Sequence, residues 1–241
     1  MQNSMQPLLK EDRFPFSCLA KLSCFNECCK DLNQFITPYD ILMLKNHLGL
    51  SSKQFLERYT TEHIGPESGL PIITLKPLDI SNTNCPFVTP DGCSVYESRP
   101  SSCRTYPLVR VIKRSRQTNK TQEHFMILKE PHCLGHNSKN NQSVKEWIEN
   151  QGLAEYNKMN DKLMDIISLK NSSPPGPIDI QFKHMFRMAC YDLDNFREHI
   201  FSKGLLDDFP MEDKTMELVK QDDKELLSLG LEWIKDHLES T

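Results

Sequence analysis

The sequence predicts an α+β fold, in which a cysteine-rich half with short helices and a small antiparallel β element precedes a helical C-terminal half. The first observation is an asymmetry, because eight of the nine cysteines precede residue 134 and only Cys190 lies beyond it. The second is the density of prolines and glycines between Cys85 and Pro107, which leaves no room for a helix there. The third is a set of apolar residues at helical spacing near the C-terminus, namely Leu227, Leu231, Ile234 and Leu238.

In the cysteine-rich half, the sequence predicts two short helices, at residues 37–49 and 51–59. Each would begin at a threonine or serine that can cap the first free amides, and a glycine would end the first one. Runs of β-prone residues predict strands at residues 70–75, 108–113 and 124–129. We expect the last two strands to form a hairpin whose basic turn is a solvated tip, with phosphate contact as the alternative.

Three long helices are predicted for the C-terminal half, at residues 144–169, 182–201 and 211–238, the second ended by Gly204. A stretch rich in asparagine and serine precedes them and marks a boundary. We therefore predict a cysteine-cluster domain at residues 14–136 and a helical region at residues 144–241.

The composition limits the classes of function. The net charge of −4 over 241 residues gives no general indication of nucleic-acid binding. No apolar run approaches the length of a membrane-spanning helix, and residues 1–13 do not resemble a secretory signal. The sequence therefore predicts a cytoplasmic protein without a nucleic-acid or membrane partner.

In a reducing compartment disulfides do not persist, so clustered cysteines indicate metal binding or redox chemistry. A segment this rich in turns cannot bury many cysteines in a core of its own, which argues against eight unligated buried thiols. We predict that these thiols bind metal, and the predicted ligands are Cys18, Cys24, Cys28, Cys29, Cys85, Cys93, Cys103 and Cys133.

Thiolates are soft ligands, and four of them complete a tetrahedral zinc site or a cubane iron–sulfur cluster. Eight cysteines could serve two such sites, or one site with spare thiols. Adjacent side chains diverge, so we expect only one member of the Cys28–Cys29 pair to bind a given ion. The spacings match neither paired zinc-ribbon knuckles nor the bacterial ferredoxin run, and they do not identify the metal.

Residues 14–136 resemble the YkgJ-type cysteine cluster family, the zinc- or iron-chelating CxxCxxCC domain. The most specific part of the likeness is the run from Val95-Tyr96 through Arg99-Pro100 and Cys103-Arg104 to Tyr106-Pro107. The other matching residues are Phe16, Cys18, Cys24, Cys28-Cys29, Tyr39-Asp40-Ile41, Leu48 to Ser51, Cys85-Pro86-Phe87, Cys93 and Cys133-Leu134-Gly135. Three residues separate Cys24 from Cys28, where the family more often has two.

The resemblance implies an iron–sulfur cluster, with [4Fe–4S] expected first, or zinc. One relative, flagellin lysine N-methylase, joins such a domain to methyl transfer, but this sequence shows no S-adenosylmethionine-binding signature. We predict that Arg99 and Arg104 contribute to cofactor binding by offsetting the thiolate charge, with salt bridges to Glu97 or Asp91 as the alternative.

Three functions follow. The first is a metal-binding protein with an iron–sulfur cluster or zinc. The second is a cluster-dependent redox or protein-modifying enzyme, for which the sequence identifies no catalytic residue. The third is a zinc-stapled module that binds a protein partner. A histidine near Cys133 could also replace one cysteine, although exposed histidines are the commoner case; the three are His124, His132 and His136.

Overall fold

A computed structural model of the chain describes residues 4–79, 81–114, 121–172, 179–206, 209 and 212–240. The described residues form two compact units, each assembled from two stretches of the chain. The first unit combines the residues up to Asp31 with Phe87–Glu155, and the second combines Leu32–Pro86 with the residues from Tyr156 onward. Helices and small antiparallel sheets make up both units, so the predicted α+β class is confirmed. The two units therefore alternate along the sequence, whereas the sequence-based prediction divides the chain once, at residues 136–144.

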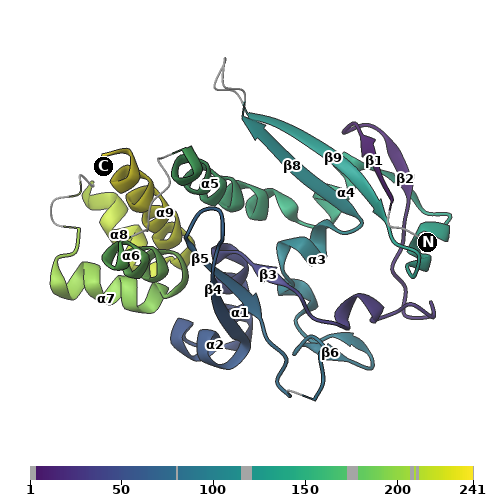
Figure 1. The fold of residues 1–241 in the computed structure, drawn as a ribbon, viewed down its shortest axis with the longest axis horizontal. Helices are drawn as coiled ribbons and strands as arrows, with labels where there is room; N and C mark the ends of the chain where they lie inside the picture. The colour runs from purple at the N-terminus through teal and green to yellow at the C-terminus, as the bar shows by residue number, and fades with distance from the viewer. Residues whose placement is uncertain are drawn as a thin grey trace. The chain divides into compact units, whose positions relative to one another are not determined.

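The largest sheet of the first unit is antiparallel, in the order β1 (Ser4–Leu8), β9 (Thr121–Lys129), β8 (Leu108–Arg114) (Figure 1). Leu108 pairs with Ile127, and both side chains are buried. The predicted hairpin is therefore confirmed. Most of its basic turn, residues 115–120, lies outside the described residues.

Two smaller antiparallel pairs also belong to the first unit. The strand β2 (Arg13–Pro15) pairs with β10 (Asn141–Ser143), although neither was predicted. The strand β6 (Val88–Thr89) pairs with β7 (Gly92–Cys93). Both pairs are too short for an alternating pattern to identify them in the sequence.

Helices and aromatic packing complete the first unit. Ser143 caps α4 (Val144–Asn150), and its hydroxyl accepts a hydrogen bond from Glu146 N. The short helix α3 (Ser101–Thr105) follows Pro100, so the prediction of no helix in this segment was wrong. Pro100 lies outside the helix interior, where it would remove a hydrogen bond. In the same unit, the centre of the Phe16 ring lies 5.6 Å from that of Trp147 and 5.7 Å from that of Tyr106.

The second unit contains the sheet β3 (Phe35–Ile36), β5 (Pro71–Leu75), β4 (Thr60–Ile64), again antiparallel. The predicted helices form as α1 (Pro38–Leu48) and α2 (Ser52–Tyr59). Thr37 and Asp40 make a capping box at the start of α1, and Gly49 ends the helix with a φ of 64°.

Each predicted long helix is two helices in the structure. Gly152, with a φ of 62°, separates α4 from α5 (Leu153–Ser172). Asp192 separates α6 (Ile180–Tyr191) from α7 (Leu193–Lys203), and Gly204 ends α7 as predicted. Asp222 separates α8 (Asp213–Gln221) from α9 (Asp223–Glu239), and its carboxylate accepts from Lys224 N. The apolar spacing continues across each break, so periodicity alone could not locate it.

The helices α6, α7, α8 and α9 gather in one part of the second unit (Figure 1). Gly230 of α9 allows close packing, because a Cβ there would lie 2.5 Å from the Ala189 carbonyl oxygen of α6. Among the described helices, none has both the length and the apolar character needed to cross a bilayer.

Candidate metal centre

The first unit holds seven of the eight predicted ligands. Cys85 lies at the end of a stretch of the second unit, and Cys190 is fully buried in α6 of that unit. All nine cysteines are among the described residues, and none of them forms a disulfide. Seven predicted ligands therefore share one unit, and Cys190 lies in a helix of the other.

Backbone contacts bring the turn that carries Cys18 to the turn that carries Cys133. Ser17 N donates to Gly135 O at 3.1 Å, and Phe16 N donates to Asn140 O at 3.0 Å. This approach requires glycine, because a Cβ on Gly135 would lie 2.6 Å from the Phe16 ring. Gly135 thus sets the spacing between two segments that are more than a hundred residues apart in sequence.

A second contact reaches a sulfur directly. Leu134 N donates a hydrogen bond to Cys24 Sγ at 3.3 Å. Hydrogen bonds of this kind stabilise a thiolate and tune the metal it binds. Cys24 is therefore held beside Cys133, although its spacing from Cys28 departs from the common family pattern.

The strand pair β6–β7 is tied to the turn at residues 24–29. Asn26 has a φ of 67° and donates from Nδ2 to Thr89 O at 2.8 Å. Gly92 has a φ of 122°, and a Cβ there would meet the Phe25 ring at 3.1 Å. These contacts hold Cys93, the last residue of β7, near the Cys28–Cys29 turn.

The thiols interact electrostatically. Burial raises the pKa of the Cys18 thiol, and the charges of Cys28, Cys133 and Cys24 raise it further. Burial also raises the pKa of Cys93, and Cys28 adds to that rise. We call Cys18 and the three thiols whose charges raise its pKa, namely Cys24, Cys28 and Cys133, the Cys18 group; the contact of Asn26 with Thr89 places Cys93 near it.

Cys28 and Cys29 differ from the sequence-based expectation. Their sulfurs lie 3.9 Å apart, so the adjacent side chains do not diverge. The hydrogen bond with Cys29 lowers the pKa of Cys28 to about 7, which outweighs the opposing effect of burial. Both residues belong to one short 3-10 turn, Glu27–Cys29.

The two arginines lie on the segment that carries Cys103. Arg104 is 8% exposed, and its guanidinium donates to the backbone carbonyls of Arg99, Glu97 and Gln151. Arg99 donates to Tyr96 O at 2.6 Å and to the side-chain amide oxygen of Gln151, with its guanidinium 3.8 Å from the centre of the Tyr96 ring. In these contacts neutral oxygens, not the carboxylates of Glu97 or Asp91, accept the hydrogen bonds.

Sequence reasoning missed Gln151, which serves both arginines. Its backbone carbonyl accepts from Arg104 and its side chain accepts from Arg99. The residue lies in the turn between α4 and α5, just before Gly152. The glycine inside the predicted long helix was the available signal for this turn.

The histidines lie in different surroundings. The His136 ring lies 5.2 Å from the Phe16 ring at an angle of 60°, and burial lowers the pKa of its imidazole. His132 Nε2 lies 3.8 Å from the Glu130 carboxylate. His124 pairs with Val111 in the β8–β9 hairpin. None of these contacts is to a cysteine sulfur.

The cysteine sulfurs are donors that suit zinc or iron, although they do not surround a common point in this structure. Among the described residues, no three side chains of His, Cys, Asp or Glu already have the spacing that holds a metal ion. The Cys18 group nevertheless offers four soft donors in one unit, one of which already accepts an N–H bond. A bound metal would need these sulfurs to draw together.

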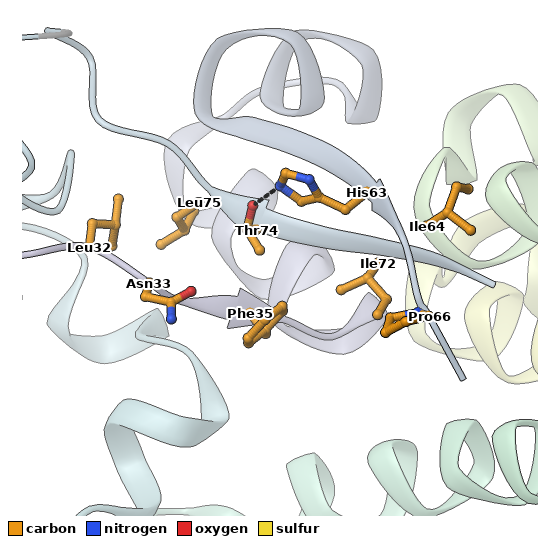
Figure 2. Close-up of a pocket in the computed structure, with 9 residues that line it drawn as sticks. All are labelled: Leu32, Asn33, Phe35, His63, Ile64, Pro66, Ile72, Thr74 and Leu75. Carbon is orange, nitrogen blue, oxygen red and sulfur yellow. Dashed lines mark hydrogen bonds between the residues drawn. The ribbon is translucent and has the colours of Figure 1, made fainter. Parts of the chain in front are cut away.

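The second unit has a hollow of a different character, of about 460 Å³, over the sheet β3–β5–β4 (Figure 2). Apolar side chains such as Phe35, Ile64 and Ile72 line it, and His63 Nε2 lies 3.1 Å from Thr74 Oγ1. No cysteine is among its lining residues. The hollow is therefore separate from the cysteine chemistry.

Comparisons with curated proteins and with solved structures find no match. A family model, CxxCxxCC, described as a "putative zinc- or iron-chelating domain", matches residues 17–142. This range includes all eight predicted ligands and covers more than half of the chain. The resemblance noted from the sequence is therefore confirmed, and the chain belongs to the CxxCxxCC family of zinc- or iron-chelating domains.

Proposed function

We propose that this protein holds an iron–sulfur cluster or zinc through thiolates in the first unit, and that the Cys18 group supplies one four-sulfur site. The observation that carries the proposal is that hydrogen bonds join the turns carrying these cysteines: Leu134 N donates to Cys24 Sγ at 3.3 Å, and Ser17 N donates to Gly135 O at 3.1 Å. Four thiolates are the number that a tetrahedral zinc ion or a cubane cluster requires.

The remaining predicted ligands are Cys29, Cys85, Cys93 and Cys103. Cys93 lies at the end of β7 and Cys103 within α3, so both come from the segment that follows the β6–β7 turn. They form a second site or a reserve of thiols, and Cys29 of the same unit is their proposed companion. A cytoplasmic location would suit both sites, because a reducing compartment keeps the thiols available for metal.

A [4Fe–4S] cluster is the first candidate for the Cys18 group. The N–H bond to Cys24 Sγ and the nearby arginine charge are of the kind that adjust the potential of such a cluster. When bound, a cluster supplies one-electron chemistry, whereas zinc supplies a structural cross-link. The chain's own residues would hold, shield and balance the charge of either one.

The test is anaerobic purification of the full chain, followed by metal analysis and visible spectroscopy. A brown protein with about four iron atoms and sulfide per chain supports the cluster. A colourless protein with stoichiometric zinc supports zinc and favours the zinc-stapled module for a protein partner. Absence of stoichiometric metal from the wild type would overturn the proposal.

Cysteine variants test which residues bind the metal. Cys18→Ser and Cys24→Ser are expected to lose the metal of the Cys18 group, because binding energy in such sites is also folding energy. Cys190→Ala is the matched control, since Cys190 is fully buried within α6 and far along the chain from the cluster. Equal metal loss in Cys190→Ala and Cys18→Ser would contradict the assignment.

A further inference from the structure

The sheet β3–β5–β4 of the second unit ends at β4, whose outer edge pairs with no other strand of the described residues. We propose that this edge binds an extended segment of another protein as an added strand, and that the apolar hollow beside it receives a side chain of that segment. The segment carries a basic residue between two apolar ones. This inference goes beyond the proposed function, because it requires neither zinc nor a cluster.

The hydrogen-bond register shows which backbone groups of β4 point to the open edge. Two backbone hydrogen bonds of 2.9 Å flank the β4–β5 ladder, namely Lys76 N to Tyr59 O and Gly65 N to Leu70 O. In an antiparallel pair, residues that exchange hydrogen bonds alternate with residues that do not. Thr61 and His63 therefore bond to β5, whereas Glu62 and Ile64 direct their N–H and C=O groups away from it. An added strand can bond to both of these residues.

The other sheet edges of comparable size resist such pairing. In the three-stranded sheet of the first unit, edge strand β1 contains Pro7, which has no N–H to donate, and edge strand β8 contains three basic residues. The opposite edge of the β3–β5–β4 sheet is only two residues long. By contrast, β4 contains no proline, lysine or arginine, and its residues 61–64 are exposed. Of the edges of these two sheets, β4 is therefore the one suited to accept a further strand.

The hollow lies on the face of the sheet that an added strand would extend. Successive side chains of a strand alternate between its two faces. Ile73 is buried in the core, whereas its neighbours Ile72 and Thr74 line the hollow (Figure 2). Phe35 and Ile64 also line it, and they are 56% and 52% exposed. Neighbouring strands lie about 4.8 Å apart, so an aromatic side chain on a strand next to β4 can reach this apolar surface.

Hydrogen bonds fix the part of the hollow that lies nearest to the edge. Thr74 Oγ1 lies 3.3 Å from Thr61 O and 3.1 Å from His63 Nε2. The hydroxyl has one proton, which it donates to the carbonyl, so it accepts a hydrogen bond from His63 Nε2. Two residues of β4 are thus held against β5 before any partner binds, which reduces the cost of ordering them on binding.

Glu62 determines which kind of strand fits the edge. Its side chain lies on the face of Ile73, and its carboxylate is 2.9 Å from Arg187 Nε of α6. If two copies of β4 paired over their full length, Glu62 would lie opposite Glu62, and directly opposed like charges are destabilising. A basic residue opposite Glu62 is favourable, and its two neighbours then lie on the face of the hollow. The edge therefore favours a segment with the order apolar, basic, apolar over a second copy of this chain.

The test is titration of the full chain with a blocked synthetic peptide, acetyl-Ser-Thr-Phe-Lys-Val-Thr-Ser-amide. Calorimetry measures its affinity, and amide hydrogen exchange locates its binding site. We expect binding that slows exchange of the Glu62 and Ile64 amides and leaves the amides of Thr61 and His63, which already bond to β5, unchanged. Absence of binding at about 1 mM peptide overturns the proposal.

Two substitutions of one residue test the edge itself. Ile64→Ala and Ile64→Pro both shorten the side chain, but only proline removes the outward N–H, and proline is tolerated at sheet edges. We expect Ile64→Pro to bind the peptide at least about tenfold more weakly than Ile64→Ala, the scale of a lost hydrogen bond. Equal binding by two folded variants would overturn the role of the edge.

An exchange of charges tests the register and does not depend on the folding of Ile64→Pro. The wild type should prefer the lysine peptide over the same peptide with glutamate in place of lysine, and Glu62→Lys should reverse this preference. The ion pair of Glu62 with Arg187 is partly exposed, so its loss should leave the fold intact. A preference that does not reverse would contradict the register.

Phe35→Ala tests the hollow. It should weaken binding of the peptide that contains phenylalanine and leave unchanged the binding of a peptide with alanine at that position. Equal weakening of both peptides would show that the phenylalanine does not enter the hollow. Sedimentation of the chain alone provides the last check, because a dimer that Glu62→Lys dissociates or strengthens would assign the edge to a second copy and overturn the proposal.

Discussion

Lys45 Nζ lies 3.0 Å from Asp223 Oδ2, across 178 residues of sequence, and the lysine side chain is only 5% exposed. Asp223 also binds Arg197 at 2.5 Å, and Asp194 lies 3.7 Å from Lys45. The second unit therefore contains a network of charges that joins α1 to the start of α9. A buried charge without its partner is costly, so this network makes specific predictions.

Asp223→Ala is expected to destabilise the second unit by about 3 kcal/mol, because Lys45 and Arg197 lose the nearer of the two carboxylates that they share. Urea unfolding monitored by circular dichroism measures the change. The control is Lys53→Ala, since Lys53 is 76% exposed and its pair with Glu57 is 4.0 Å long. Its effect should stay within about 0.5 kcal/mol, and a similar effect of both variants would contradict the role of the network.

The same carboxylate predicts a pH dependence. Burial alone would raise the pKa of Asp223, but the hydrogen bonds and charges of Arg197 and Lys45 outweigh burial and lower it. Its contribution to stability is therefore complete above the unfolded aspartate pKa of about 3.9 and is lost as the pH falls through the lower folded value. The stability gap between the wild type and Asp223→Asn should thus be constant near pH 7 and close below about pH 3.9. A gap that widens on acidification would refute this.

Local signals in the sequence were enough for the short elements. Thr37 caps the start of α1, and Gly49, with its left-handed backbone, ends that helix. The β-prone runs on either side of the basic turn pair as a hairpin. Local residue chemistry also predicted metal binding, since cysteines at short intervals among turn formers indicate a metal site whatever the fold around them.

The long-range arrangement of the helices and strands could not be predicted from local signals in the sequence. The breaks at Asp192 and Asp222 leave the apolar spacing intact, so the helices read as continuous. The strand β2 pairs with β10, more than a hundred residues away, through only three residues. Gln151 acts through its backbone carbonyl and its side-chain amide, a role that the residue type alone does not predict. These features depend on tertiary contacts that periodicity cannot encode.

Alanine substitutions at two glycines distinguish the effect of backbone strain from the effect of the geometry of the metal centre. Gly135→Ala is expected to lower metal retention, because the new Cβ would lie 2.6 Å from Phe16 and push apart the turns that carry Cys18 and Cys133. Gly49→Ala is the matched control, since its φ of 64° imposes strain of about 1 kcal/mol but its Cβ meets no other atom. We expect Gly49→Ala to lower the unfolding temperature slightly at full metal content. Metal loss equal to that of Gly135→Ala would mean that stability alone controls retention.

The interleaved units predict how a fragment of residues 144–241 will behave. Ile41, Leu42 and Leu44 of α1 are buried within the second unit, where α1 contacts α6 and α9. The fragment lacks α1 and the strands β3, β4 and β5, so it would expose the apolar faces that these elements cover. Fragments 144–241 are therefore expected to show reduced helical circular dichroism and concentration-dependent association. A fragment that unfolds cooperatively as a helical monomer would show that the C-terminal helices form an independent domain. The control is the full chain, which contains α1 and the strands β3, β4 and β5 and should keep its helical signal.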